Sequence, residues 1–490
     1  MGAKPISAGR SSRFVPEALV PAFGQPVRML RWGRRKGKGV SGKHSVADGV
    51  APFGESALSR RDFLKLGGAG LAGAALLGTT GCGGWGRSSN DLVFASWHDV
   101  GVTHGVTQQL LKQFNKQGKG RASFREGPQQ DGEYLEKLKT EFQVGGGRID
   151  VTVADTIWTA ELAEGGWIAD VSNRFSGGER SRFLDGSVQS LLYRGSIYGV
   201  PWGADAGMLY YRKDLLEKSG FSGPPKTWEE LEEMAGKAVR DSGTRFGFVF
   251  QGADYEGGVC NGLEFIWSHG GEVVDPEAPD RVIVGSPEAV AGLAAERSMV
   301  SNGIAPQAVA NYDETHAQTT FLAGDAVFCR NWPYMYALAG NPETYAGRLG
   351  IKSEQVGVSA LPVGNGQRQT ASCIGGQNLL INASSERQDE IWDLVRFLTD
   401  EKRQKRRVPD NAPTLKSLYE DRRVLEAMPV LSLGKEALEN ARPRPSSPRY
   451  WEMSDAMSRQ FNSVLTGATP PEEAVETLQS ELQQVIERGE

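Results

Sequence analysis

The chain has 490 residues, with 55 Lys and Arg against 60 Asp and Glu, and a formal net charge of −5. Residues 1–89 hold 14 basic and 4 acidic side chains, so the rest carries 41 against 56, a net charge of −15. This acidic body argues against nucleic acid as a partner, and its length allows two or three domains of ~150 residues.

The first 58 residues are basic and rich in Gly, Ser and Pro, which is typical of a disordered leader. Export signals usually begin near the start of a chain, so translation from Met29 or a later codon is one hypothesis. The alternative is a long n-region that is discarded after export.

An export signal follows at 59–82. Residues 59–65 read Ser-Arg-Arg-Asp-Phe-Leu-Lys, a twin-arginine signature, and a mildly apolar run extends from Leu66 to Gly78. A transmembrane helix is the alternative, because no charge falls between Lys65 and Arg87. The many glycines of this stretch weaken a helix by up to ~1 kcal/mol each, which favours an export signal.

The signal ends in small residues before Cys82, an arrangement that resembles a lipoprotein lipobox. Thr79 stands where such boxes prefer Leu, so simple cleavage is the alternative to lipidation. With lipid on Cys82 and a tether at 83–90, we expect an extracytoplasmic body that is anchored to the cell membrane.

Cysteine is scarce, and its spacing gives no sign of a metal site. A disulfide is allowed outside the cytoplasm, for example between Cys260 and Cys329, and buried free thiols are the alternative. There is no CxxC pair and no His/Cys cluster with zinc spacing, so no metal and no cofactor are predicted. The four cysteines are Cys82, Cys260, Cys329 and Cys373.

The body opens with an alternation of strands and helices. Residues 92–97 predict a buried strand, 106–116 and 134–144 predict helices, and 150–154 predict a second strand. This order is typical of a mainly parallel α/β sheet. Ligands of such sheets sit beyond the carboxyl ends of the strands, where Asp155 lies.

Further along, an extended segment at 198–214 leads into a new apolar strand. Thr227 and Glu230 form the pattern of a capping box that opens a helix. A helix at 389–403 has Ile391, Leu394, Val395 and Leu398 on one side and is predicted to cover a sheet.

Seven short motifs then occur in a fixed order. They are Asp155–Glu161, Gly166-Trp167, Phe250–Gly252 with Tyr255–Gly257, Phe321–Asp325, Arg330–Tyr334, Ile374–Leu379 and Ala441–Pro443. Each motif alone is weak. Taken in order, they make the chain from about residue 91 to the end resemble the extracellular solute-binding proteins of the ABC sugar importers. The nearest subgroup is the trehalose- and maltose-binding lipoproteins.

This resemblance implies a two-lobed, periplasmic-binding-protein-like fold of class II, with two α/β lobes joined by several chain crossings. We expect crossings near Asp205, Phe328 and Cys373. The first lobe would then comprise 91–205 and 328–372, and the second 206–327 and 373–490. The helix at 389–403 would cover the sheet of this second lobe. The partners would be a small sugar and the membrane-bound permease subunits, and the protein would be a monomer.

Sugar binding requires carboxylates that accept hydrogen bonds from hydroxyl groups, and aromatic rings that cover the sugar faces. The candidate carboxylates follow predicted strands or lie at a crossing, and Trp332 is the foremost stacking candidate. The candidate set is Trp97, Asp155, Trp158, Asp205, Tyr255, Glu256, Asn331, Trp332, Gly375, Gly376 and Arg442.

Each candidate has a structural alternative. Asp155 could cap the helix that follows it, Glu256 could be a first-turn carboxylate favoured by the helix dipole, and Asp205 could be a turn residue. Trp332 could be core packing, and Arg442 could pair with a surface acid. Similarly, Gly375 and Gly376 could form a hinge or a point of close approach, and Trp97 and Trp158 could belong to the core.

The predicted mechanism is hinge closure around a disaccharide, followed by delivery to the permease. Three alternatives stay open: a binding protein for a longer oligosaccharide or a glycerophosphodiester, an exported glycosidase with paired carboxylates, and a lipoprotein that only docks a sensor partner. The absence of a dense Arg/Lys cluster near the motifs counts weakly against a phosphorylated ligand.

Overall fold

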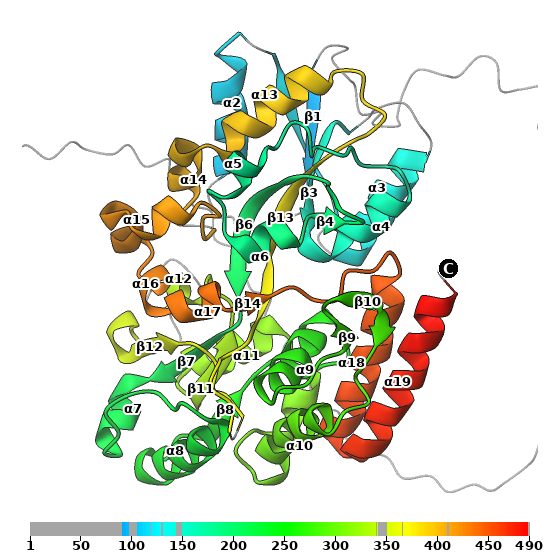
Figure 1. Cartoon of the computed structure of the whole chain (residues 1–490). Coiled ribbons are helices and arrows are strands. Elements are labelled where there is room, and N and C mark those ends of the chain that lie inside the picture. Colours follow the sequence, from blue (N-terminus) through cyan, green and yellow to red (C-terminus); the bar gives the residue numbers. More distant parts are fainter. Residues whose placement is uncertain are drawn as a thin grey trace, which may run out of the picture. The chain divides into compact units, whose positions relative to one another are not determined.

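The structure, a computed structural model, describes residues 91–97, 105–118, 120–128, 131–143, 149–339, 341, 350–364, 366–408 and 411–488. All of them belong to one compact unit, Trp85–Glu490, which contains two large sheets flanked by helices (Figure 1). The twin-arginine signature, Cys82 and the tether lie outside the described residues. Among the described residues, no helix is both long and apolar enough to cross a membrane.

The first large sheet combines strands from both ends of the chain. β1 pairs in parallel with β2 and β3, and β13 runs antiparallel to β3 and β6. Helix α2 turns Leu110, Leu111 and Phe114 into the core, as the 3.6-residue period requires. The bounds are β1 (Leu92–Ser96), α2 (Val106–Asn115), β2 (Ala122–Glu126), α3 (Asp131–Gln143), β3 (Val151–Asp155), β6 (Val200–Ala206), β13 (Ser372–Ile381), α13 (Gln388–Thr399) and β14 (Ala441–Arg442).

The second large sheet has the strand order β12-β7-β11-β8. Its central strand β11 pairs antiparallel with β7 and parallel with β8, and all six of its residues are buried. The bounds of this lobe are β7 (Met208–Arg212), α7 (Lys213–Lys218), α8 (Trp228–Ser242), β8 (Phe246–Val249), α9 (Glu256–Ser268), α10 (Pro287–Ser301), α11 (Glu314–Leu322), β11 (Ala326–Asn331), β12 (Val356–Ser359), α18 (Tyr450–Thr466) and α19 (Pro471–Glu487).

Short elements complete the described chain. They are η1 (Thr156–Trp158), α4 (Thr159–Glu164), α5 (Gly177–Arg180), α6 (Asp185–Gln189), β4 (Leu192–Tyr193), β5 (Ser196–Ile197), β9 (Val274–Asp275), β10 (Ala278–Val282), η2 (Gln307–Asn311), α12 (Met335–Leu338), η4 (Ser353–Gln355), α14 (Glu401–Arg407), η5 (Lys416–Tyr419), α15 (Arg422–Ala427), α16 (Val430–Leu433) and α17 (Lys435–Glu439).

The early strands and helices agree with the sequence prediction to within a few residues. Thr227 is the N-cap of α8, and its side chain accepts a hydrogen bond from the backbone N–H of Glu230 at 3.2 Å. In a capping box the Glu230 side chain would accept a hydrogen bond from the backbone N–H of Thr227. It accepts one from the backbone N–H of Lys226 instead, at 2.7 Å. The Glu230 carboxylate therefore still pairs with a free backbone N–H, that of the residue before the N-cap.

The later lobe assignments need correction. Residues 328–372 were expected in the first lobe, yet β11 and β12 join the second sheet. Conversely, β13 lies in the first sheet, and α13 contacts α2 instead of covering the second sheet. The reason is that buried strands of both sheets are equally apolar, so their composition cannot tell which sheet supplies their hydrogen-bond partners.

Two crossings bear on the site. The chain leaves the first sheet after Ala206 and starts β7 at Met208, close to the predicted crossing at Asp205. It returns to the first sheet through β13, which carries Gly375 and Gly376. Cys260, Cys329 and Cys373 are buried free thiols, so the described structure has no disulfide between Cys260 and Cys329.

Candidate ligand-binding site

Asp155 ends strand β3 and faces the second lobe through Arg444. Its Oδ1 accepts hydrogen bonds from Ile157 N at 3.1 Å and Thr156 Oγ1 at 3.3 Å, so the carboxylate does cap the short helix η1. Arg444 Nη2 donates to the same oxygen at 3.1 Å. The capping role and a ligand role are compatible, because these bonds engage only one of its two oxygens.

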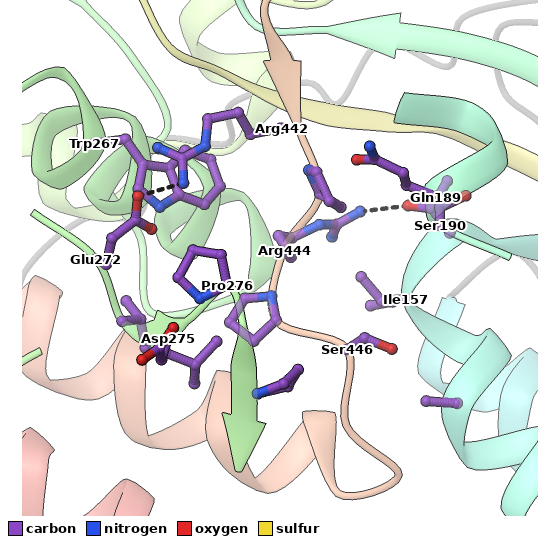
Figure 2. Close-up of a pocket in the computed structure, with 17 residues that line it drawn as sticks. Ile157, Gln189, Ser190, Trp267, Glu272, Asp275, Pro276, Arg442, Arg444 and Ser446 are labelled. Atoms are coloured by element: carbon purple, nitrogen blue, oxygen red, sulfur yellow. Dashed lines mark hydrogen bonds and ion pairs between the residues drawn. The ribbon is translucent and has the colours of Figure 1, made fainter. Parts of the chain in front are cut away.

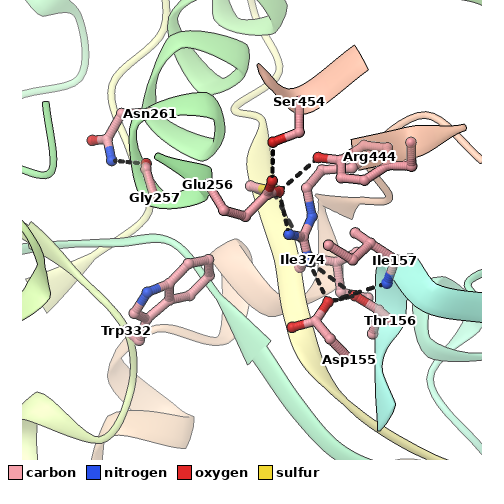
Figure 3. A network of polar contacts seen from close by, with 12 residues as sticks. Asp155, Thr156, Ile157, Glu256, Gly257, Asn261, Trp332, Ile374, Arg444 and Ser454 are labelled. Carbon is pink, nitrogen blue, oxygen red and sulfur yellow. Dashed lines mark hydrogen bonds and ion pairs between the residues drawn. The ribbon is translucent and has the colours of Figure 1, made fainter. Parts of the chain in front are cut away.

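Arg444 joins the two lobes, although it is not among the residues predicted from the sequence. Its Nη1 donates to Glu256 Oε1 at 2.6 Å, while its Nη2 donates to Asp155 and, at 3.0 Å, to Thr156 Oγ1 (Figure 3). The side chain is 4% exposed. Its Nε is buried and has no partner in the described part of the chain, which leaves one donor unused.

Glu256 is the first residue of α9, as its dipole-based alternative requires. Besides Arg444, it accepts hydrogen bonds from Tyr450 Oη at 2.6 Å and from Ser454 Oγ, both on α18 (Figure 3). Its two oxygens are therefore engaged by three donors. The carboxylate acts as the anchor of Arg444 and is less available to a ligand than Asp155.

Asp205, Gly375 and Trp332 form a second part of the site. Gly375 on β13 pairs directly with Asp205 on β6. A Cβ added at Gly375 would lie 3.0 Å from the Trp332 ring and 3.3 Å from Asp205 Cβ. Gly376 has φ 107°, and a Cβ there would lie 2.2 Å from Gly203 O. Both glycines are thus points of close approach, in agreement with the structural alternative.

Glu314, at the start of α11, is a further residue that the sequence analysis missed. Tyr255 Oη donates to Glu314 Oε2 at 2.7 Å, and Trp332 Nε1 donates to Oε1 at 3.3 Å. Asn331 Nδ2 donates to the Glu314 backbone O at 3.3 Å. Burial and the adjacent Glu314 carboxylate raise the pKa of Tyr255, so its phenol remains a neutral donor.

The two remaining tryptophans differ in exposure. Trp158 is 1% exposed and packs on Trp97 with a centroid distance of 5.4 Å, so its expected ligand contact is corrected to a core role. Trp97 is half-buried and lines a cavity of about 270 Å3 together with Glu126, Gln377 and Arg407. Trp97 therefore remains a candidate.

Arg442 does not join Asp155 and Glu256. It pairs with Glu272 and lies over the Trp267 ring, 4.9 Å from its centroid (Figure 2). It lines a cavity of about 250 Å3, with Ile157 and Pro276 among the other walls. The expected ligand role thus gives way to the ion-pair alternative, and Arg444 takes the expected place. Both arginines stand in one Arg-Pro-Arg-Pro run, which was the available signal.

The described residues contain no cluster of His, Cys, Asp and Glu that could hold a metal ion. What they offer is a set of hydrogen-bonding groups and the half-buried indole rings of Trp97 and Trp332. Carboxylates, a guanidinium and an aromatic face are the groups that bind uncharged, hydroxyl-rich molecules. The arrangement suits recognition of such molecules.

Comparison with known proteins assigns the family. Residues 102–405 match the bacterial extracellular solute-binding protein family. A Deinococcus radiodurans protein described as a probable ABC transporter-binding protein is 38% identical over 70% of this chain and 81% of its own. A galactooligosaccharide-binding protein of Bacillus subtilis is 24% identical over 61% of this chain and 68% of its own.

The fold comparison points the same way. The structure of maltose-bound MalE3 from T. maritima superposes with a TM-score of 0.70 and 36% identity, covering 80% of this chain and 99% of that one. This relative has the two-lobed binding-protein fold, in agreement with the two sheets described above. The chain therefore belongs to the bacterial extracellular solute-binding protein family.

Proposed function

We propose that this protein captures a disaccharide of the trehalose or maltose type outside the cytoplasm and delivers it to the ABC permease. The observation that carries the proposal is the juxtaposition of Asp155 from the first lobe with Glu256 from the second through Arg444. A ligand that contacts this group touches both lobes at once and therefore favours their closed arrangement.

Three groups would contact the sugar directly. One carboxylate oxygen of Asp155 takes part in none of the hydrogen bonds described above, and the Nε of Arg444 has no partner among the described residues. Trp332 would cover an apolar sugar face, and Asp205 lies beside it. Glu256 would hold Arg444 in place, because three donors already engage its oxygens. The maltose in the T. maritima relative supports a sugar of this size.

The anchoring also belongs to the proposal. Lipid on Cys82, after export by the twin-arginine route, would keep a monomeric body close to the permease. The predicted acidic body and short tether fit this placement. No enzyme activity is proposed, since the relatives are described as transporter-binding and sugar-binding proteins.

Calorimetry tests the ligand. The mature body is titrated with trehalose, maltose and sucrose, and micromolar affinity, about −8 kcal/mol, is expected for at least one of them. Heat only with a longer oligosaccharide or a glycerophosphodiester would replace the disaccharide by that ligand. Glucose released during a long incubation would favour the glycosidase alternative. Asp155 and Glu256 are poorly placed as a free acid and base, because both pair with Arg444.

A further inference from the structure

Trp332 has one face covered from behind. The Arg330 guanidinium lies 4.0 Å from the centroid of the Trp332 ring. Arg330 is 1% exposed and is held by Glu264 through two hydrogen bonds of 2.8 and 2.7 Å. Such a bidentate, buried pair keeps the guanidinium plane fixed. A ligand could therefore stack only on the opposite face of the indole, which Arg330 does not cover.

The backbone and one edge of Trp332 are fixed as well. Tyr210 Oη donates to the Trp332 backbone O at 2.7 Å, and Trp332 N donates to Asn331 Oδ1 at 2.8 Å. The benzo edge lies so close to Gly375 that a Cβ there would come within 3.0 Å of it. The remaining polar group of Trp332 is the indole Nε1–H.

Glu314 adds a further restraint on the ring at that N–H. Its Oε1 accepts from Trp332 Nε1 at 3.3 Å, and its Oε2 accepts from Tyr255 Oη at 2.7 Å. Glu314 is the first residue of α11, and the N-cap Asp313 before it accepts a hydrogen bond from the backbone N–H of His316. Glu314 thus ties the indole to Tyr255, which precedes α9, with one oxygen for each donor.

We propose that Glu314 is a positioning residue, which orients the open face of Trp332 toward the sugar and acts through Trp332 without touching the ligand itself. The inference rests on the proposed function, because it takes a sugar as the ligand that stacks on Trp332. The same carboxylate fixes the Tyr255 phenol, so removal of Glu314 releases both aromatic groups. A fixed ring discriminates between sugar faces, whereas a freely rotating ring accepts several.

A double-mutant cycle on the full chain tests this role. Glu314→Ala is expected to weaken binding of the best disaccharide at least tenfold in the wild-type background and less than twofold in the Trp332→Phe background. Glu314→Gln retains one acceptor oxygen and is expected to restore part of the affinity. Equal losses in both backgrounds would show that Glu314 does not act through Trp332, and would overturn the proposal.

A second readout does not need sugar. In protein labelled with 5-fluorotryptophan, Trp332→Phe assigns the Trp332 fluorine signal, which Glu314→Ala is expected to shift and broaden. An unchanged signal would overturn the positioning role even if no sugar bound, whereas absence of sugar binding in wild type would remove only the proposed function. Glu288→Ala is the matched control, because Glu288 is an exposed first-turn carboxylate on α10.

Discussion

The Arg444 guanidinium lies 2.6 Å from the Glu256 carboxylate and links it to Asp155 of the other lobe at 3.1 Å. One cation thus pairs with two acids, one at the end of strand β3 and one at the start of helix α9 of the other lobe. This arrangement couples the lobes through charge, because separating them would leave buried charges without partners. A sugar that offers hydroxyls to the same groups replaces part of that interaction.

Replacing Arg444 is expected to damage both binding and stability. Arg444→Met leaves Asp155 and Glu256 as two partly buried acids without their shared cation, and loss of such a partner costs about 3 kcal/mol. Calorimetry and urea denaturation measure the two effects. Arg444→Lys should rescue little, because one ammonium cannot reproduce the fork geometry.

Arg442→Met is the matched control for that experiment. Its pair with Glu272 is partly exposed, and pairs of this kind contribute ~0–1 kcal/mol. Sugar affinity in this variant should stay within threefold of wild type. A large loss with Arg442→Met and none with Arg444→Met would restore the original assignment of Arg442.

Gly375→Ala is expected to weaken sugar binding while leaving the fold intact. The added methyl would lie 3.0 Å from the Trp332 ring, so the ring must shift by a few tenths of an ångström. We expect about a tenfold loss of affinity, since stacking depends on ring placement. Gly132→Ala on α3, where the added Cβ meets nothing within 4 Å, is the control and should not change binding.

Glu296 predicts a pH dependence of stability. It is 3% exposed on α10, and burial followed by the nearby Glu264 raises its pKa to about 8. The unfolded carboxyl titrates near 4.5, so the folded chain binds more protons than the unfolded chain between these values. The free energy of unfolding should therefore fall as pH rises from 4.5 to 8, by at most about 1.4 kcal/mol per pH unit.

Urea denaturation at several pH values across this window measures the effect. Glu296→Gln removes the titration and should flatten the profile. Glu288→Gln on the same helix is exposed and should leave the slope as in wild type. A wild-type profile that rises steadily from pH 5 to pH 8 would contradict a buried carboxyl at Glu296.

The leader makes a prediction about anchoring. Cys82→Ser should abolish incorporation of an alkyne-labelled fatty acid and release the body into the medium. Replacing Arg60 and Arg61 together by Lys should retain the precursor inside the cell, because the twin-arginine route reads the guanidinium pair. Thr79→Leu introduces the residue that lipoboxes prefer, and this variant should incorporate the fatty acid at least as well as wild type. Incorporation by the Cys82→Ser protein would refute lipidation at this cysteine.

The local elements could be predicted because their signals are local. Leu110 and Phe114 recur at helical spacing on α2, and the short run before Asp155, rich in β-branched residues, favours a strand. The capping residue Thr227 was found for the same reason. The sheet membership of β11 and β13 depends on pairings between distant segments, which no local pattern contains.

The candidate site shows the same limit. Asp155 and Trp332 could be chosen from their motifs, but the choice between Arg442 and Arg444 depends on how one proline-rich segment passes between the lobes. Glu314 was not predictable, since its partners Tyr255 and Trp332 lie 59 and 18 residues away in the chain. Trp158 was misjudged because an aromatic residue beside a ligand carboxylate can equally fill the core.

Titration of wild type and Asp155→Asn with trehalose and maltose tests the central claim that an acid of one lobe holds a disaccharide against the other. We predict micromolar binding of one of these sugars by wild type and a loss of about 2 kcal/mol or more in the variant. Equal affinities in the two proteins, or no heat from either sugar, would contradict it.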